Sequence, residues 1–458
     1  MLGIGRAGPL GPAALVADEA AHGEQAVAAR AAAGLAASSG RVPDEAEREA
    51  LAVLVSVPGI GPATLARLIG AIGSAREVVD LARRPGARAR LTAAAPSRGD
   101  RPGGVNGEIA HAIIDAAGRT DEIVGRVRAA GLTVVTLDDE SYPPRLRATE
   151  LPPLALFVRG SVEALSSRRA VAMVGTRSAT AHGRQVASQL AALLSAAGAT
   201  VVSGLAIGID GAAHAGVVAI HGATVAVLGG GHDRLYPVAH ARLARTIAEE
   251  GGAVISEHAP GTSPTRYTFP RRNRIIAGLA EATIVVEAGR GSGALTTAVW
   301  AMEQGRGCFV VPGAIGAPTW AGCLELLREC HGVARIVAGP AELLMDLDLP
   351  DDLAKEGESG RLPGSGGVPT VAAVLLELGP TARSVGRALV AGLATPDDLV
   401  AATDLPIATV LASLTVLEGR GLATSAYGRY RAAGALAAAL PRGRRTAPVP
   451  RVGGHRAS

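Results

Sequence analysis

The sequence predicts an α/β protein whose largest domain is a doubly wound parallel sheet. Over residues 131–345, short apolar runs alternate with segments of helical pattern, and several runs stop at a glycine just before a helix begins. With 458 residues, the chain has room for roughly two to four domains. The main strands are expected at 170–174, 200–203, 224–228, 253–256, 283–287 and 308–311, with helices between them, for example at 183–197, 211–220 and 293–303.

The region before the sheet has a helical pattern. Residues 45–55 form an amphipathic segment, and 57–68 resemble a helix–hairpin–helix in which Gly59 and Gly61 flank a buried Ile60. Free amides at the start of the second helix can face a phosphate. Such hairpins also serve as plain helical joints, so contact with DNA or a partner and a structural role both stay open. A Pro-, Gly- and Arg-rich interruption is expected over 83–107.

Two short strands, at 131–137 and 154–158, precede the main sheet, and the alternating pattern decays after residue 336. Three helices and a small hairpin then follow in the order of a winged helix. Its recognition helix, about 407–418, has almost no basic residues, so we expect protein docking there as readily as duplex reading. The predicted divisions are a flexible extension (1–44), a helical helix–hairpin–helix domain (45–130), the sheet domain (131–345), a linker (346–369), a winged-helix-like domain (370–435) and a basic tail (436–458).

Composition sets further bounds. Positive charge is carried almost wholly by arginine, because Lys355 is the only lysine, and the net charge of +4 with a pI near 9.3 permits nucleic-acid binding. The arginine bias can equally reflect a GC-rich genome. Cys308, Cys323 and Cys330 have no metal-binding or disulfide spacing and are interpreted as reduced thiols. We find no membrane-spanning run or signal peptide, so a cytoplasmic location is expected.

The glycine loops at the strand ends favour anion binding over a nucleotide cofactor. Gly175-Thr176-Arg177-Ser178 supplies amides, hydroxyls and a guanidinium at the end of one strand. The loop lacks GxGxxG spacing, and the next strand ends at Ser203 without a ribose-binding carboxylate. The chain has no Walker lysine and no GxSxG nucleophile elbow. We therefore predict no cofactor and no catalytic residue.

Asp210 and His214 are four residues apart and share a helix face. The pair could act in acid–base chemistry or hold a metal, but no third ligand has metal spacing. A carboxylate favoured by the helix dipole, packed by a histidine, is the interpretation we prefer. We predict no metal site.

A run of arginines and aromatic residues follows the strand at 253–256. Arg266, Tyr267, Phe269, Arg271, Arg272 and Arg274 combine charge that can neutralise phosphates with rings on which bases can stack. A charge run is usually a solvated face. This one lies between a strand end and a helix start of the same sheet, which favours single-stranded nucleic-acid binding.

The stretch from about 142 to 337 strongly resembles the DprA/Smf family of DNA-processing proteins. The resemblance depends on Tyr142-Pro143, Gly175-Thr176-Arg177, Ser203-Gly204 through His214, Tyr236-Pro237, Ser256-Glu257, Phe269-Pro270 with Arg272-Asn273-Arg274, Ser292-Gly293 and Val311-Pro312-Gly313. It departs from the family at Ile207, where arginine is common, and at Ala321, where a serine usually precedes the glycine.

The resemblance implies an extended Rossmann-like domain that binds single-stranded DNA, forms a dimer, and helps load RecA recombinase in natural transformation. A nucleotide-processing hydrolase of the phosphoribohydrolase type is the alternative, although its PGGxGTxxE signature is absent. The predicted DNA-binding residues are Thr176, Arg177, Gly208, Arg266, Phe269, Arg272 and Asn273.

Overall fold

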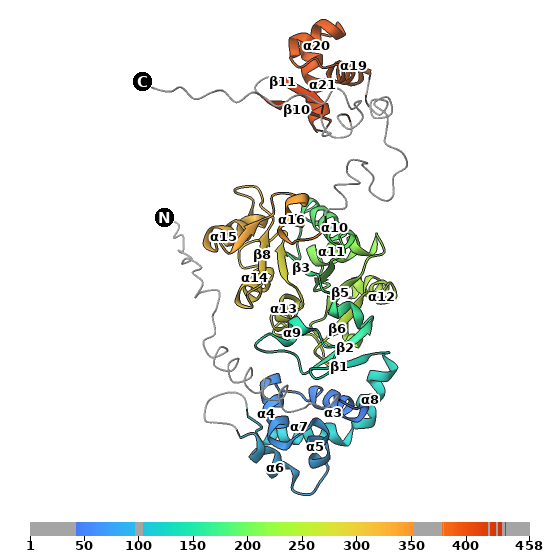
Figure 1. The fold of residues 1–458 in the computed structure, drawn as a ribbon, viewed down its shortest axis with the longest axis vertical. Coiled ribbons are helices and arrows are strands. Elements are labelled where there is room, and N and C mark those ends of the chain that lie inside the picture. Colours follow the sequence, from blue (N-terminus) through green and yellow to red (C-terminus); the bar gives the residue numbers. More distant parts are fainter. Residues whose placement is uncertain are drawn as a thin grey trace, which may run out of the picture. The chain divides into compact units, whose positions relative to one another are not determined.

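The computed structural model describes residues 43–96, 104–350, 378, 380–419, 422–426, 429–432 and 436. The chain forms two compact units, 1–354 and 355–458, and each is described by itself (Figure 1). The predicted extension, linker and basic tail lie outside the described residues except at their edges. The finer domain boundaries stay predictions, because one hydrophobic core runs from the N-terminal helices into the sheet.

Between residues 43 and 129, the described part of the chain before the sheet contains six helices. α3 begins where predicted, after Asp44, whose carboxylate accepts a hydrogen bond of 2.8 Å from the Glu47 amide. The expected interruption over 83–107 is wrong in part, because α6 lies inside it: Ala and Leu favour helix, and Leu91 is fully buried. The helices are α3 (Glu45–Val55), α4 (Pro62–Ile72), α5 (Ala75–Ala82), α6 (Ala87–Ala94), α7 (Gly107–Gly118) and α8 (Thr120–Ala129).

A nine-stranded sheet dominates the unit, in the order β1-β2-β6-β5-β4-β3-β7-β8-β9. The seven strands from β6 to β9 are parallel, which confirms the predicted fold class, whereas β2 pairs antiparallel with both β1 and β6. β9 was not predicted. The strands are β1 (Thr133–Thr136), β2 (Ala155–Gly160), β3 (Ala170–Val174), β4 (Thr200–Ser203), β5 (Thr224–Val227), β6 (Ala253–Ser256), β7 (Ala282–Val285), β8 (Gly307–Val310) and β9 (Ala334–Ile336).

Helices cover the sheet on both faces, so its central strands are buried along their whole length (Figure 1). α10 packs against α11, and α13 packs against α14. The helices are α9 (Pro144–Arg147), α10 (Ala181–Ala196), α11 (Ile209–Val218), α12 (Ala241–Glu249), α13 (Thr268–Leu279), α14 (Gly293–Glu303), α15 (Ala321–Glu329) and α16 (Pro340–Asp346), with 3₁₀ turns η1 (Glu163–Ser166), η2 (His232–Arg234), η3 (Val238–His240) and η4 (Pro318–Trp320).

The N-terminal helices are fastened to the sheet edge formed by β1 and β2. Phe157 of β2 is fully buried in a small cluster with Ala52 of α3, Val127 of α8 and Ala259. The Arg48 Nε of α3 donates 3.3 Å to the Asp139 carboxylate beside β1. The helical part and this edge of the sheet are therefore packed as one body.

The second unit has its own core, and its described residues show the predicted order of three helices and a hairpin. A capping box starts α20, in which the Thr395 hydroxyl accepts 3.2 Å from the Asp398 amide. Within the described residues no single helix is long and apolar enough to span a membrane. The pair α20 and α21 together has the length and composition of a membrane span, but it is bent by 112° at the break between the two helices. The elements are α19 (Pro380–Val390), α20 (Pro396–Thr403), α21 (Ile407–Gly419), β10 (Ala423–Ala426) and β11 (Arg429–Ala432).

Candidate nucleic-acid interface

Two glycine loops meet at the carboxyl edge of the sheet, after β3 and after β4. Gly208 has φ of +94°, and a Cβ there would lie 2.2 Å from the Thr176 carbonyl oxygen, so only glycine fits this contact. The Ile209 amide donates 3.3 Å to the same oxygen. The structure thus brings Thr176, Arg177 and Gly208 together, as expected if they share a site.

Phe269, in the first turn of α13, lies against these loops. The Arg177 guanidinium carbon is 4.9 Å from the centroid of the Phe269 ring, and the Tyr236 ring centroid is 5.8 Å from it. A Cβ on Gly229 would lie 2.8 Å from the Phe269 ring, so this glycine lets the ring approach the loop after β5. We call Arg177, Tyr236 and Phe269 the aromatic grip.

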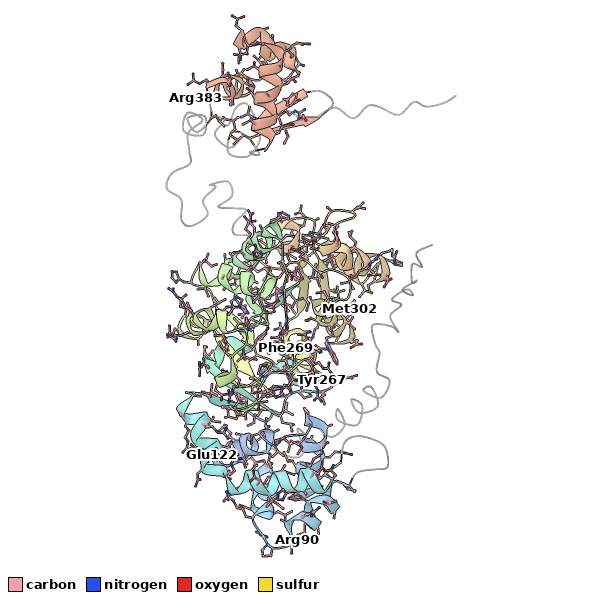
Figure 2. All side chains as sticks on the ribbon, turned by 180° about the vertical axis from the view of Figure 1, so that it is seen from behind. Arg90, Glu122, Tyr267, Phe269, Met302 and Arg383 are labelled. Carbon is pink, nitrogen blue, oxygen red and sulfur yellow. The ribbon has the colours of Figure 1, made fainter. Side chains whose placement is uncertain are left out.

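Tyr236 was missed by the sequence prediction of the site, although 53% of it is exposed beside Phe269. Its only signal was the Tyr236-Pro237 motif, which does not reveal a neighbour 33 residues away in the chain. Arg266 forms a second cation–π pair, with its guanidinium carbon 4.7 Å from the centroid of the Tyr267 ring. Tyr267 is 65% exposed and precedes α13 directly (Figure 2). Two exposed aromatic side chains thus lie beside predicted site residues.

The predicted DNA contact by Arg272 does not fit the structure, because this side chain is only 5% exposed. Its guanidinium donates to the carbonyl oxygens of Gly204, at 2.6 Å, and Val227. A Cβ on Gly204 would lie 2.4 Å from the guanidinium. Burial lowers the Arg272 pKa to about 10. Arg272 therefore links the ends of β4 and β5 by hydrogen bonds below the candidate interface.

Helix geometry separates the predicted arginine run. Arg266 and Arg271 are exposed, whereas Arg272 and Arg274 face the protein interior. Asn273 is half-buried, and its side-chain amide donates 3.2 Å to the Gly293 carbonyl oxygen at the start of α14. Consecutive residues lie about 100° apart around a helix, so a run of charges at a helix start cannot present one face.

Asp210 and His214 have separate partners. Asp210 accepts 3.1 Å from the Gly204 amide, while His214 Nδ1 lies 2.9 Å from the Thr224 hydroxyl. Burial raises the pKa of Asp210 and lowers that of His214 to about 3. Among the described residues, no group of three His, Cys, Asp or Glu side chains could hold a metal ion.

The Glu287 carboxylate, at the end of β7 beside β3, is fully buried. Strand order reverses between these two strands, and dinucleotide-binding sheets place their cofactor at such a point. Here the carboxylate accepts hydrogen bonds from the Thr180 amide, at 3.1 Å, and the Thr180 hydroxyl, at 3.0 Å. Both hydrogen bonds hold the start of α10, so this carboxylate has a structural partner.

Two buried histidines predict acid sensitivity. Burial lowers the pKa of His214 to about 3 and of His232 to about 4. Below pH 6.5 the unfolded chain protonates these residues while the folded chain does not, so stability falls as pH falls. The free energy of unfolding, measured by urea denaturation, should fall by on the order of 2 kcal/mol per histidine between about pH 7 and pH 5. In a His214→Gln variant, the free energy of unfolding should depend less steeply on pH. If it depends on pH as steeply as in the wild type, His214 does not contribute to the acid sensitivity.

Known proteins resemble the chain over this region. The family described as DNA recombination-mediator protein A matches residues 133–348. A Mycobacterium tuberculosis relative that bears the DprA name is 40% identical over 314 residues, which cover 66% of this chain and 77% of the relative. The chain belongs to the DprA/Smf family. Protein Smf of Escherichia coli is 43% identical over 223 residues, covering 48% of this chain and 59% of that protein.

The X-ray structure of the DprA/Smf family member DNA processing protein A from Streptococcus pneumoniae is similar to this one. Its TM-score is 0.52 and its sequence identity 28%, over 67% of this chain and 99% of that chain. The family match begins at β1 and ends just after α16, so it spans the whole sheet and every loop of the aromatic grip. Family membership thus rests on the domain that carries the candidate interface.

Proposed function

We propose that this DprA/Smf family protein binds single-stranded DNA through the carboxyl edge of its sheet and acts in DNA processing and recombination without catalysing a reaction. The observation that carries the proposal is the aromatic grip, in which an arginine and two aromatic rings gather beside glycine loops. Stacking on exposed rings tolerates any base, because every base has a π-face. A duplex hides its bases in a stack and cannot use the rings in this way.

The proposed contacts divide into phosphate binding and stacking. Thr176 supplies a hydroxyl, the buried Gly208 lets the two loops approach each other, and Arg177 and Arg266 supply guanidinium groups. Asn273 holds the Gly293 turn close to the start of α13. Stacking would use Phe269 with Tyr236 and Tyr267, while Arg272 has a positioning role. The proposed DNA-binding set is Thr176, Arg177, Gly208, Tyr236, Arg266, Tyr267, Phe269 and Asn273.

The proposal extends to what family resemblance implies: protection of incoming single-stranded DNA in natural transformation, loading of RecA, a homodimeric state and a cytoplasmic location. A mobility shift with single-stranded DNA, with and without RecA, tests the recombinase step. A supershifted complex that requires this protein supports it. RecA filaments that form equally fast without the protein would oppose it.

A nucleotide-processing hydrolase is the weaker alternative. The buried acidic residues near the strand ends already have internal partners: Asp210 the Gly204 amide, Glu257 the Arg274 guanidinium and Glu287 the Thr180 amide. A general base needs a carboxylate that can reach a substrate proton. Release of free base from nucleoside monophosphates would revive the alternative.

The purified protein should bind oligo-dT more tightly than a duplex of equal length. Its affinity should fall steeply with salt, with a slope of about −0.7 per phosphate contact on single strands. Fluorescence anisotropy from low to moderate salt measures both quantities. Equal or tighter binding of the duplex across the salt range would end the proposal.

A further inference from the structure

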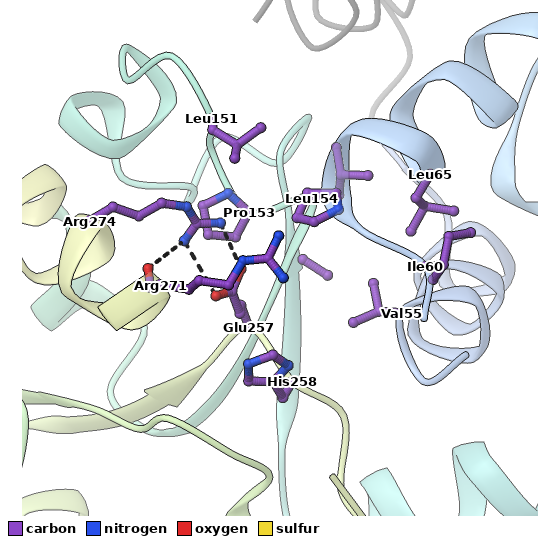
Figure 3. Close-up of a pocket in the computed structure, with 12 residues that line it drawn as sticks. Val55, Ile60, Leu65, Leu151, Pro153, Leu154, Glu257, His258, Arg271 and Arg274 are labelled. Atoms are coloured by element: carbon purple, nitrogen blue, oxygen red, sulfur yellow. Dashed lines mark hydrogen bonds and ion pairs between the residues drawn. The ribbon is translucent and has the colours of Figure 1, made fainter. Parts of the chain in front are cut away.

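A pocket lies where the helix–hairpin–helix meets the sheet (Figure 3). None of the residues that line it belongs to the aromatic grip. We call it the junction pocket. Its empty volume is about 610 Å³, part of it open to solvent. The hairpin and α4 supply one wall, the segment leading into β2 supplies another, and the end of β6 with the start of α13 supplies the third. It is lined by Val55, Ile60, Pro62, Leu65, Leu151, Pro153, Leu154, Ala155, Glu257, His258, Arg271 and Arg274.

The polar side of the junction pocket contains two cations with different roles. Arg274 and Glu257 form a buried ion pair of 2.7 Å, with side chains 7% and 10% exposed. The two charges of that pair cancel each other, and the ion pair holds both side chains in place in the pocket lining. Arg271, in contrast, is exposed, and no ion-pair partner for its guanidinium is found within the described residues. Its charge is available to a ligand.

The Arg271 guanidinium lies beside the hairpin. A Cβ built on Gly61 would be 4.0 Å from Arg271 Nη2. Gly61 is the N-cap of α4, an 11-residue helix whose start has no side-chain cap and no acidic residue. The amides and dipole of such a start favour an anion. The hairpin and Arg271 thus approach one point from two different elements.

His258 adds a second polar group. Its Nε2 is buried and has no hydrogen-bond partner within the described part of the chain. A buried, unsatisfied ring nitrogen is costly unless a ligand or water meets it. Burial lowers the His258 pKa, so the ring is neutral near pH 7 and can hydrogen-bond the edge of an uncharged ring. Apolar side chains such as Leu65 and Leu154 form the walls around it.

The start of α13 links the junction pocket to the aromatic grip. Phe269 and Arg271 are two residues apart, which places them about 200° apart around the helix. Phe269 consequently faces the glycine loops, whereas Arg271 faces the hairpin. Residues 265–267, 270 and 271 are exposed, so this helix start offers an exposed surface between Phe269 and Arg271.

We propose that the junction pocket is a second nucleotide subsite for the same DNA strand: it takes a base between its apolar walls with His258 at the base edge, and a backbone phosphate between Arg271 and the hairpin. The proposal rests on the proposed function. It assigns the helix–hairpin–helix a role in lengthening the bound strand, and it explains why the hairpin faces α13.

An oligo-dT length series tests the subsite in the full-length protein. The series runs from about four to about 16 nucleotides, the range of site sizes on known single-strand platforms, so that the shortest tests the aromatic grip and the longest tests the grip together with the junction pocket. Arg271→Ala should leave the short oligonucleotide unaffected, weaken the long one about tenfold, and reduce the salt slope by about 0.7. Arg90→Ala is the matched control, because Arg90 is an exposed arginine far from the pocket, at the tip of the helical part (Figure 2).

Further arms separate the possible outcomes. Leu151→Trp adds bulk at the half-buried pocket wall without changing charge, and it should also weaken only the long oligonucleotide. If the wild type binds neither oligonucleotide, the proposed function itself is wrong. If it binds both and Arg271→Ala behaves as Arg90→Ala does, the subsite alone is wrong. Free dAMP that binds in an Arg271-dependent way, with long-oligonucleotide affinity unchanged, would overturn the assignment to a strand.

Discussion

Arg272→Ala is expected to destabilise the first unit by about 3–5 kcal/mol, the range for removing one partner from a buried charged network. The substitution leaves the buried carbonyl oxygens of Gly204 and Val227 without their donor. It also removes the positive charge that faces the buried Asp210. Urea denaturation followed by circular dichroism measures the loss.

Arg271→Ala is the control for this prediction, since it removes the same side chain one position earlier on α13. Arg271 is exposed, so its replacement should change the free energy of unfolding by no more than about 0.5 kcal/mol. If Arg272→Ala instead unfolds like the wild type and loses DNA affinity, Arg272 contacts DNA directly and its positioning role is wrong.

Phe269→Ala is expected to weaken binding of single-stranded DNA by about 5- to 150-fold, because base stacking contributes about 1–3 kcal/mol per base. The substitution also removes the ring under the Arg177 guanidinium, so this arginine loses its fixed position. Fluorescence anisotropy with labelled oligo-dT gives the ratio of dissociation constants.

Two variants make the Phe269 experiment specific. Phe269→Tyr keeps a ring and should retain most of the affinity, whereas Phe269→Leu keeps apolar bulk and should not. Because the ring also packs on Gly229, thermal unfolding of each variant must accompany the binding data. Full affinity in a folded Phe269→Ala protein would remove stacking from the proposed function.

Local pattern was sufficient for most of the fold. The strands Ala170–Val174, Thr200–Ser203 and Ala253–Ser256 and the helix Glu45–Val55 lie where the sequence predicts them, because each is a continuous apolar or amphipathic run bounded by a cap or glycine. β9 was missed, since three residues carry too little periodicity. The antiparallel pairing of β2 was also missed, because pairing direction depends on distant strands.

The candidate site was only partly visible in the sequence. Arg177 and Phe269 are 92 residues apart, and their cation–π contact exists only because β3 and the start of α13 meet at one sheet edge. Tyr236 joins them from a third loop. The sequence pattern identified arginines and aromatic residues as candidates, but it could not show that Arg271 is exposed and Arg272 is buried.

The sequence by itself determined the family, the parallel sheet and the glycine loops, because these depend on short-range spacing and on motifs that keep their order along the chain. Only the tertiary structure decided which charges reach solvent. A step of one residue along α13 turns a side chain by about 100°, so Arg271 points to the hairpin while Arg272 is buried against two carbonyl oxygens. The junction pocket likewise exists only where the helical part packs on the sheet.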